Sequence, residues 1–595
     1  MLRLTLVWLC FLDLGGGWSR SRSLPLWNRD PEDPIGRPAE QAERQRFLLD
    51  LLLQVHKPLL HQELTAMGSR LNEEPSDYQE GAMRSLREFL DSVHENKVPR
   101  PFGIYSQLDK AMPEHLLGVY RFLVLARDWY SFQRNACYAR IHFHPILFVN
   151  AFQLAVDERE DTKDLRLPAM YEVLPQLYFE EEVILAAQEV SWQQLVPTRA
   201  ASPKSTWLEV LRGYLSPRRP LDKEEPLNAD AVVIDDERKV AHLSFDVQLS
   251  SYWNNMINRL TISIEEWKES ERDMRLYSRF PQLFFDVIEQ FVTALMMEDV
   301  ATGQISMELI DPPLITTGGV PFTGTSMDTE AVRGVLSQTI DHLQAQINDA
   351  VSNVTQPSDI PFIVQHLVAS QYLNICRDLS LAINDHGPGR PSMLDLATAN
   401  LRDPIYRSLL LRLNRLVFSY EVGALPIIDT DLINVMDQQL LQTHRNNLRL
   451  LRRRLVARQR RLNHGTFHIT VELSAPAEVS VQTDLYLALR NQSRPRLHLD
   501  GFVSTLRKGI NVFQRHFPSC TRGSRPTMSQ LYGTNSPATD GTRSRGLPPH
   551  LLVPRGAEEG LKLQLIIELT EPGLENEWSG AILHTESTDV LIFHH

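Results

Sequence analysis

Cysteine is scarce in this sequence. The 595 residues contain four cysteines, and Cys10 lies in a leader segment that we expect to be removed, which leaves Cys137, Cys376 and Cys520. An odd number with no closely spaced pair excludes a small scaffold held together by disulfides. Two of the three could still pair in the folded chain, and buried free thiols are the alternative.

Long apolar runs and excess positive charge are also missing. Beyond the first residues, no stretch reaches the ~18 consecutive apolar residues of a membrane-spanning helix, so we expect no membrane span. The net charge of -13 excludes a general nucleic-acid binder, because most of the surface would repel a polyanion. No G-x-S-x-G, H-E-x-x-H or P-loop pattern stands out, so no common catalytic motif supports an enzyme.

The amino-terminus has the features of a secretory signal. Arg3 precedes an apolar run over residues 4–14, and small residues follow over 15–19. This order predicts a signal peptide at 1–19 and an extracellular protein, with an amphipathic amino-terminal helix as the alternative. The polar, proline-rich residues 20–43 predict an extended arm. Two N-glycosylation sequences, at Asn353 and Asn491, fit a secretory route.

The hydrophobic pattern predicts two helical regions. A chain of 595 residues is too long for one core, so three or four domains are expected. Residues 44–190 carry apolar side chains three and four positions apart, as at Phe47, Leu51 and Val55, which is typical of helices. A second helical region over 191–424 contains a proline-rich connector and a Gly-, Pro- and Thr-rich loop.

The carboxy-terminal part, 425–595, predicts a different structure. A helical span over 425–462 leads into it and ends in a basic run. The hydrophobic period then becomes two, first from Phe467 to Leu473 and again from Leu561 to Ile567, which predicts half-buried antiparallel strands. Residues 519–546 predict a long exposed loop. The fold class is therefore multidomain α+β, with all-α and helical-bundle domains followed by an antiparallel β-sandwich.

Several motifs resemble the arthropod hemocyanin, prophenoloxidase and hexamerin superfamily. ARDWYSF at 126–132 resembles the family's AKDFDTF, and LPAMYEVLP at 167–175 resembles LPxxYEIYP. RDPIY at 402–406 resembles RDPIFY, and LDGFV at 499–503 resembles LDKFV. The resemblance covers nearly all of the mature chain. It implies three domains, a central bundle with the fold of a type-3 copper site, and assembly into hexamers.

The family's copper ligands are missing from this sequence. Its oxygen-binding members hold two copper ions with three histidines each, partly as H-x3-H pairs whose imidazoles share one helix face. The resemblance places the six ligand positions on Trp253, Ile257, Ile288, Leu373, Arg377 and Leu410. None of these side chains suits copper, so we predict no metal and no cofactor. The aliphatic ones are expected to pack together, and a buried Arg377 would need a carboxylate from elsewhere in the chain.

Other basic residues have a structural interpretation and a functional alternative. His142 and His144 could bind metal from a strand, but their segment resembles a helical part of the family without metal. His464 and His468 have the H-x3-H spacing, but a turn and a strand at this point favour a structural role. A basic run could bind an anion, and a solvated or interface helix face is the favoured interpretation; it consists of Arg449, Arg452, Arg453, Arg454, Arg458, Arg460 and Arg461.

The resemblance and the missing ligands together predict a function. Copper-free relatives include hexamerins, which are insect hemolymph storage proteins, and the crustacean pseudohemocyanins or cryptocyanins. We predict a secreted, non-enzymatic storage protein that serves as an amino-acid reservoir, forms homo- or hetero-hexamers with related subunits and could meet an uptake receptor. The 8% aromatic content and 14 methionines show no enrichment of the aromatic- or methionine-rich hexamerin kind.

Two alternatives remain open at this point. The first is a carrier of small hydrophobic ligands or a cuticle component, which a cavity in place of the copper site would favour; a filled core would favour storage. The second is copper-dependent oxygen transport or phenoloxidase activity, which requires that the six ligand positions are aligned wrongly.

Overall fold

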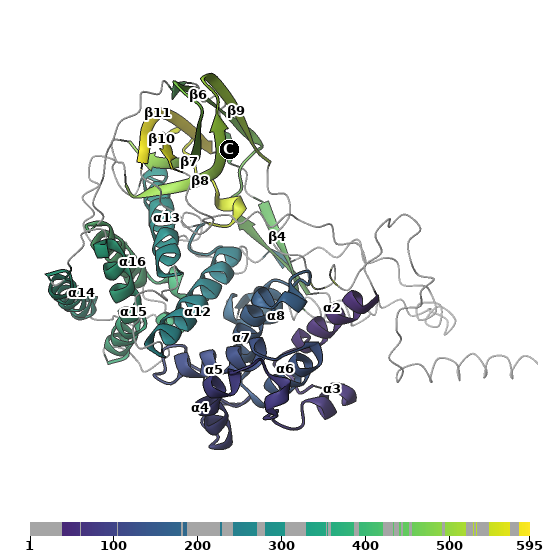
Figure 1. The fold of residues 1–595 in the computed structure, drawn as a ribbon. Helices are drawn as coiled ribbons and strands as arrows, with labels where there is room; N and C mark the ends of the chain where they lie inside the picture. Colours follow the sequence, from purple (N-terminus) through teal and green to yellow (C-terminus); the bar gives the residue numbers. More distant parts are fainter. Residues whose placement is uncertain are drawn as a thin grey trace, which may run out of the picture.

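The fold places helices first and strands last along the chain (Figure 1). The structure is a computed structural model. It describes residues 39–59, 61–103, 105–179, 182–186, 227–228, 242–269, 280–303, 329–352, 354, 359–385, 392–420, 432–433, 439–441, 444–450, 455–490, 494–518, 528, 531, 547–571 and 582–594.

The amino-terminal region is helical, as predicted, but its first helix begins at Ala39, inside the stretch over 20–43 that was predicted to be an extended arm. Its helices are α2 (Ala39–Leu52), α3 (Gln62–Met67), α4 (Ala82–His94), α5 (Met112–Val124), α6 (Trp129–His142), α7 (Pro145–Glu158) and α8 (Met170–Val173). Local signals fix where they begin; the Asp128 side chain, for example, accepts a hydrogen bond from the Ser131 amide at 2.8 Å and so caps α6. Cys137 on α6 is a buried free thiol.

The middle region consists of longer helices. They are α12 (Val247–Glu269), α13 (Phe280–Ala301), α14 (Thr329–Ser352), α15 (Ile360–Asp385) and α16 (Pro404–Phe418). The R-D-P motif at 402–404 marks the start of α16. Asp403 accepts hydrogen bonds from the amides of Ile405 and Tyr406 at 2.8 and 3.2 Å, and Pro404 supplies a first helical residue that needs no amide partner.

The carboxy-terminal region forms antiparallel sheets, which confirms the predicted fold class. Its strands include β6 (Phe467–Ala475), β7 (Val479–Leu489), β8 (Arg496–Leu506), β9 (Gly509–Phe517), β10 (Leu561–Thr570) and β11 (Ile582–His594). One sheet has the order β3-β11-β10-β7-β8 and another the order β2-β6-β9, with the short β2 (Leu432–Ile433) and β3 (Gln439–Leu441) at their edges. Along β6, buried and half-buried residues alternate, as the period of two predicts.

The predicted helix over 425–462 is wrong where the structure describes this span. Residues 444–450 and 455–461 form the strands β4 (His444–Leu450) and β5 (Leu455–Arg461), which pair antiparallel, and β1 (Leu227–Asn228) pairs with β5 in parallel. Leu, Arg, Gln and Ala favour a helix locally, but antiparallel backbone pairing of the two segments with each other overrides this preference. The described arginines of the basic run therefore lie on strands, and the helix face proposed for them does not exist there.

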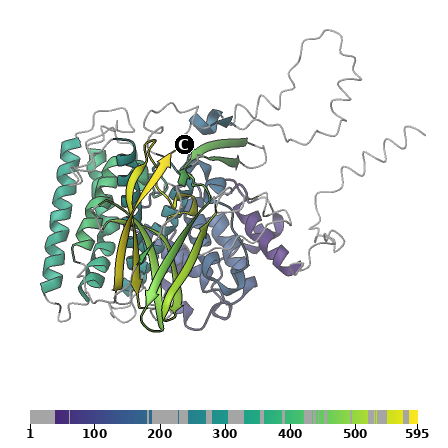
Figure 2. The same cartoon turned by 90° about the horizontal axis from the view of Figure 1, so that it is seen from above.

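One hydrophobic core cluster joins the middle helices to the sheets. It contains Phe291 of α13 and Leu410 of α16 together with Val471 of β6 and Leu565 of β10, all at most 1% exposed. Helix α13 lies directly beneath the strands (Figure 1). Seen from above, the strands cover the space between α14–α16 and the amino-terminal helices (Figure 2). The middle helices and the sheets are therefore one packed body.

Candidate functional site in the middle helices

Five aromatic side chains form the centre of the middle helices, and we call them the aromatic centre. They are Trp253 of α12, Phe284 and Phe291 of α13, Tyr372 of α15 and Tyr406 of α16. The Trp253 ring stacks on Phe284 and Phe291 at centroid distances of 5.6 and 6.1 Å, and its edge meets Tyr406 at 6.4 Å. All five are at most 1% exposed, so the point where four helices meet is filled with rings.

The polar atoms of the aromatic centre satisfy one another. The Trp253 Nε1 donates a hydrogen bond to the Tyr406 hydroxyl at 3.1 Å, and the hydroxyls of Tyr372 and Tyr406 are in contact. Burial raises the pKa values of both tyrosines well above the usual range, so they stay protonated. Burial also raises the pKa of the Cys376 thiol, one turn beyond Tyr372, to about 12. The described side chains of the aromatic centre are thus all uncharged.

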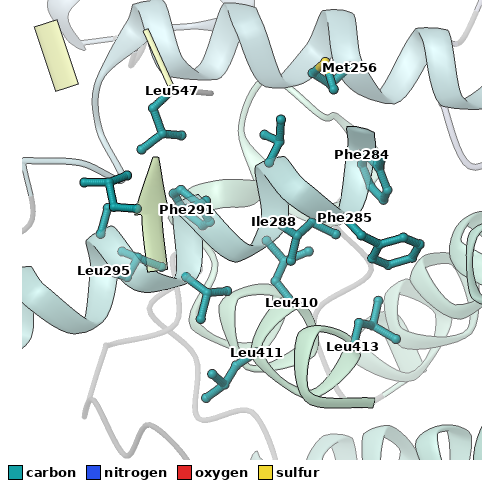
Figure 3. Packing of buried hydrophobic residues seen from close by; sticks show 14 of the residues in the cluster. Met256, Phe284, Phe285, Ile288, Phe291, Leu295, Leu410, Leu411, Leu413 and Leu547 are labelled. Atoms are coloured by element: carbon teal, nitrogen blue, oxygen red, sulfur yellow. The ribbon is translucent and has the colours of Figure 1, made fainter. Parts of the chain in front are cut away.

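Four of the six predicted ligand positions lie in this core. Trp253, Ile257, Ile288 and Leu410 are at most 2% exposed and belong to the same hydrophobic cluster. Ile288 and Leu410 face each other between α13 and α16 (Figure 3). These indole and aliphatic side chains offer copper no lone pair, so the residues present do not fit a type-3 copper pair.

The other two positions, Leu373 and Arg377, lie at the edge of the packed region rather than inside it. Leu373 is half-buried at the edge of the cluster, and both residues line a separate cavity between α5, α12 and α15. Arg377 is held by neutral groups rather than by the carboxylate that was expected. Its Nε donates to the Leu108 carbonyl at 2.6 Å and its Nη1 donates to the Asn374 side chain at 2.8 Å.

Sequence reasoning missed Tyr372 and Cys376, which lie one residue before Leu373 and Arg377. They occupy the inward face of α15 that the prediction assigned to their neighbours. One residue along a helix corresponds to about 100° of rotation, so a shift of one position moves a side chain from the core to the rim. The signal that could have found them is the apolar stripe through Val368, Tyr372 and Leu379.

Three other histidines that were considered as metal ligands make contacts that stabilise the fold. His142 contacts the Gly68 carbonyl at 3.2 Å and stacks on Tyr138, and the His144 ring accepts from the Ile146 amide at the start of α7. His464 is buried between the carbonyls of Gly465 and Pro549, which confirms the structural interpretation. Among the residues that the structure describes, no group of three or more His, Cys, Asp or Glu side chains could hold a metal ion.

Some predicted features lie outside the described residues. They are the signal peptide, most of the arm, both glycosylation acceptors Asn353 and Asn491, Cys520, and most of the connector and of the loop over 519–546. Met528 and Leu531, which the structure describes within that loop, are buried in a hydrophobic cluster, so the loop is not exposed throughout as predicted. Within the described part, no helix is both long and apolar enough to cross a membrane.

Two models of protein families match the sequence. Residues 41–164 match the family described as "Hemocyanin, all-alpha domain", and residues 425–577 match "Hemocyanin, ig-like domain". The first match covers most of the amino-terminal helices and the second covers most of the strands. Their order along the chain is the order of helical and sheet regions in the structure.

Curated relatives match over most of the chain. Arylphorin subunit beta of Manduca sexta is 22% identical, and the match covers 88% of this chain and 84% of the relative. Hexamerin 70b of Apis mellifera is 21% identical, with 88% of this chain and 86% of the relative covered. The sequence similarity therefore extends through the middle helices that lie between the two family matches.

Solved structures show the same fold at lower identity. A scorpion hemocyanin in its activated state matches with a TM-score of 0.59 at 16% identity, covering 93% of this chain and 100% of that chain. A crustacean hemolymph prophenoloxidase matches with a TM-score of 0.58 at 13% identity, covering 92% and 96%. At these identities the likeness concerns the fold alone.

Proposed function

The chain belongs to the hemocyanin superfamily, and we propose that it is a copper-free member that serves as a secreted hemolymph storage protein. The observation that carries the proposal is the aromatic centre. Indole, phenyl and protonated phenol side chains, with no histidine among them, fill the point where the middle helices meet, and four predicted ligand positions are among the packed residues. The similarity to an arylphorin and a hexamerin supports storage rather than oxygen chemistry.

The finer features of the proposal follow from the family and from the sequence. We propose a signal peptide at 1–19, glycosylation at Asn353 and Asn491, and a division into 44–190, 191–424 and 425–595. We also propose assembly into hexamers with identical or related subunits, and no enzymatic activity. The cavity beside Leu373 and Arg377 supports the alternative function, a carrier of small hydrophobic ligands.

Copper analysis of the purified native protein tests the proposal most directly. Elemental analysis is expected to give less than about a tenth of a copper per chain, with no oxygen-dependent absorbance band, because indole and aliphatic groups do not bind copper. About two coppers per chain with such a band would overturn the proposal and restore an oxygen carrier or an oxidase. Light scattering on the same sample tests assembly, with an expected mass near six times the 68.2 kDa of one chain.

A further inference from the structure

We propose that the cavity between α5, α12 and α15 binds a small amphiphilic monocarboxylate, a site separate from the aromatic centre. The cavity has a volume of about 260 Å³. This lies just below the roughly 300–1,000 Å³ of drug-sized ligand sites, so a compact ligand fits its size. The inference holds for a storage protein and for a carrier alike, because it depends only on the residues that line the cavity.

One part of the cavity wall is apolar. Leu260 and Ile264 of α12 and Ala369 of α15 are at most 5% exposed, and the half-buried Leu373 lies beside them on the lining. A hydrocarbon tail placed against these side chains loses contact with water at a gain of about 25 cal/mol for each Å² buried. This wall therefore contributes affinity for a hydrocarbon tail but little specificity.

The charges around the cavity favour an anion. Its lining includes three cations, Lys110, Lys268 and Arg377, and the two carboxylates Glu114 and Glu265. Lys268 is already paired with Glu265 at 2.7 Å. The remaining Lys110 and Arg377 exceed Glu114 by one positive charge, which matches a ligand with a single negative charge.

Arg377 is placed to hold the head group of such a ligand. A guanidinium has five N–H donors, and two of them are used by the Leu108 carbonyl and the Asn374 side chain. Within the described part of the chain, no carboxylate lies at ion-pair distance from Arg377 or Lys110. The two bonds fix the planar group in one orientation, and its free N–H groups suit the two oxygens of a carboxylate.

Calorimetric titration of the full-length protein with octanoate and with octanol tests the site. These probes share an eight-carbon tail and differ in the carboxylate, so octanoate is expected to bind once per chain and at least tenfold more tightly than octanol. The variants R377Q and K110Q are expected to weaken octanoate binding at least tenfold and to leave octanol binding unchanged. K57Q, which removes an exposed lysine outside the cavity, is the matched control and should bind octanoate like the parent protein.

Lys110 is exposed and makes no ion pair among the described residues, so K110Q keeps the test valid even if R377Q disturbs the contact with Leu108. Equal affinity for octanoate and octanol, or octanoate binding that K110Q and R377Q leave unchanged, would overturn the proposal. So would the absence of any octanoate binding at millimolar concentration. Each of these outcomes leaves the copper content unaffected and is thus distinguishable from failure of the storage proposal.

Discussion

Glu298, near the end of α13, is a carboxyl group held away from water. It is 4% exposed, and its Oε1 accepts hydrogen bonds from the amides of His242 and Leu243 at 2.9 and 3.4 Å. Burial is the main cause that raises its pKa to about 8, and the neighbouring Asp299 adds to the rise. The group is therefore protonated in the folded chain at a pH where it is ionised in the unfolded chain.

This difference predicts a loss of stability with rising pH. Between the ordinary pKa of 4.5 and the folded value of about 8, unfolding releases a proton, so the free energy of unfolding falls as pH rises. The slope from this group reaches about 1.4 kcal/mol per pH unit. The neutral E298Q variant should lose that slope between pH 6 and 8, measured by urea unfolding at several pH values. The exposed-site control E63Q should keep it, and an unchanged slope in E298Q would contradict the assignment.

Single residues of the candidate site differ in how well the sequence predicts their positions. The sequence has no histidine at the predicted ligand positions Trp253, Ile257, Ile288 and Leu410, and these residues do pack in one cluster. The sequence does not show which side of α15 faces the core. Tyr372 and Cys376 lie four residues apart, and so do Leu373 and Arg377, so either pair could point inward. Only contact with α13 and α16 decides that Tyr372 points inward.

At the scale of elements, the segment just before α5 ties the amino-terminal helices to the middle ones. Gln107 is 8% exposed. Its Nε2 donates to the Asn258 side chain on α12 at 3.0 Å, and its Oε1 accepts from the Ala397 amide at 3.0 Å. Leu108 next to it belongs to the core cluster of the middle helices. A few residues outside any helix thus set how the two helical regions meet.

Substituting Gln107 should therefore weaken this junction. In Q107A the Ala397 amide and the Asn258 side chain lose their partner in a buried place, at a cost of about 1–3 kcal/mol each. The apparent free energy of unfolding in urea should fall by roughly 2–6 kcal/mol. Q62A on the exposed helix α3 is the control and should stay within about 0.5 kcal/mol. A Q107A protein as stable as the control would show that the Gln107 hydrogen bonds do not stabilise the junction.

Elements also differ in how well the sequence predicts them. The sequences of β6, β7 and β10 have a hydrophobic period of two, so the pattern alone identifies them, although much of β7 and the second half of β10 are buried on both faces. The strands β4 and β5 have few apolar residues and many arginines, and no period marks them. They pair antiparallel with each other, and β5 also pairs with β1 from a distant part of the chain, and local propensity encodes neither pairing.

At the scale of the whole molecule, a buried pair joins the sheet region to the first long middle helix. The His550 Nε2 lies 2.8 Å from the Asp246 Oδ2, and both side chains are 1% exposed. The other oxygen of Asp246 accepts from the amides of Gln248 and Leu249 at 2.9 and 2.8 Å. One carboxylate therefore caps α12 and holds a residue that lies 304 positions later in the chain.

Replacing Asp246 should affect both regions at once. D246A removes a helix cap, at about 1 kcal/mol, and leaves His550 buried without this partner, at about 1–3 kcal/mol. Hydrogen exchange should become faster both at the start of α12 and around residues 547–553, while the exposed-site control D91A leaves both unchanged. Faster exchange confined to α12 would mean that the pair does not couple the two regions.

Among the residues that the structure describes, two buried free thiols can report when their surroundings open. Burial raises the pKa values of Cys137 and Cys376 to about 12 each, so neither thiol is a ready nucleophile in the folded chain. Cys137 lies on α6 and Cys376 on α15, in two separate hydrophobic clusters. An alkylating reagent can reach each sulfur only after its own cluster opens. Alkylation followed by peptide mass analysis thus times the opening of the amino-terminal helices and of the middle helices independently, without any engineered probe.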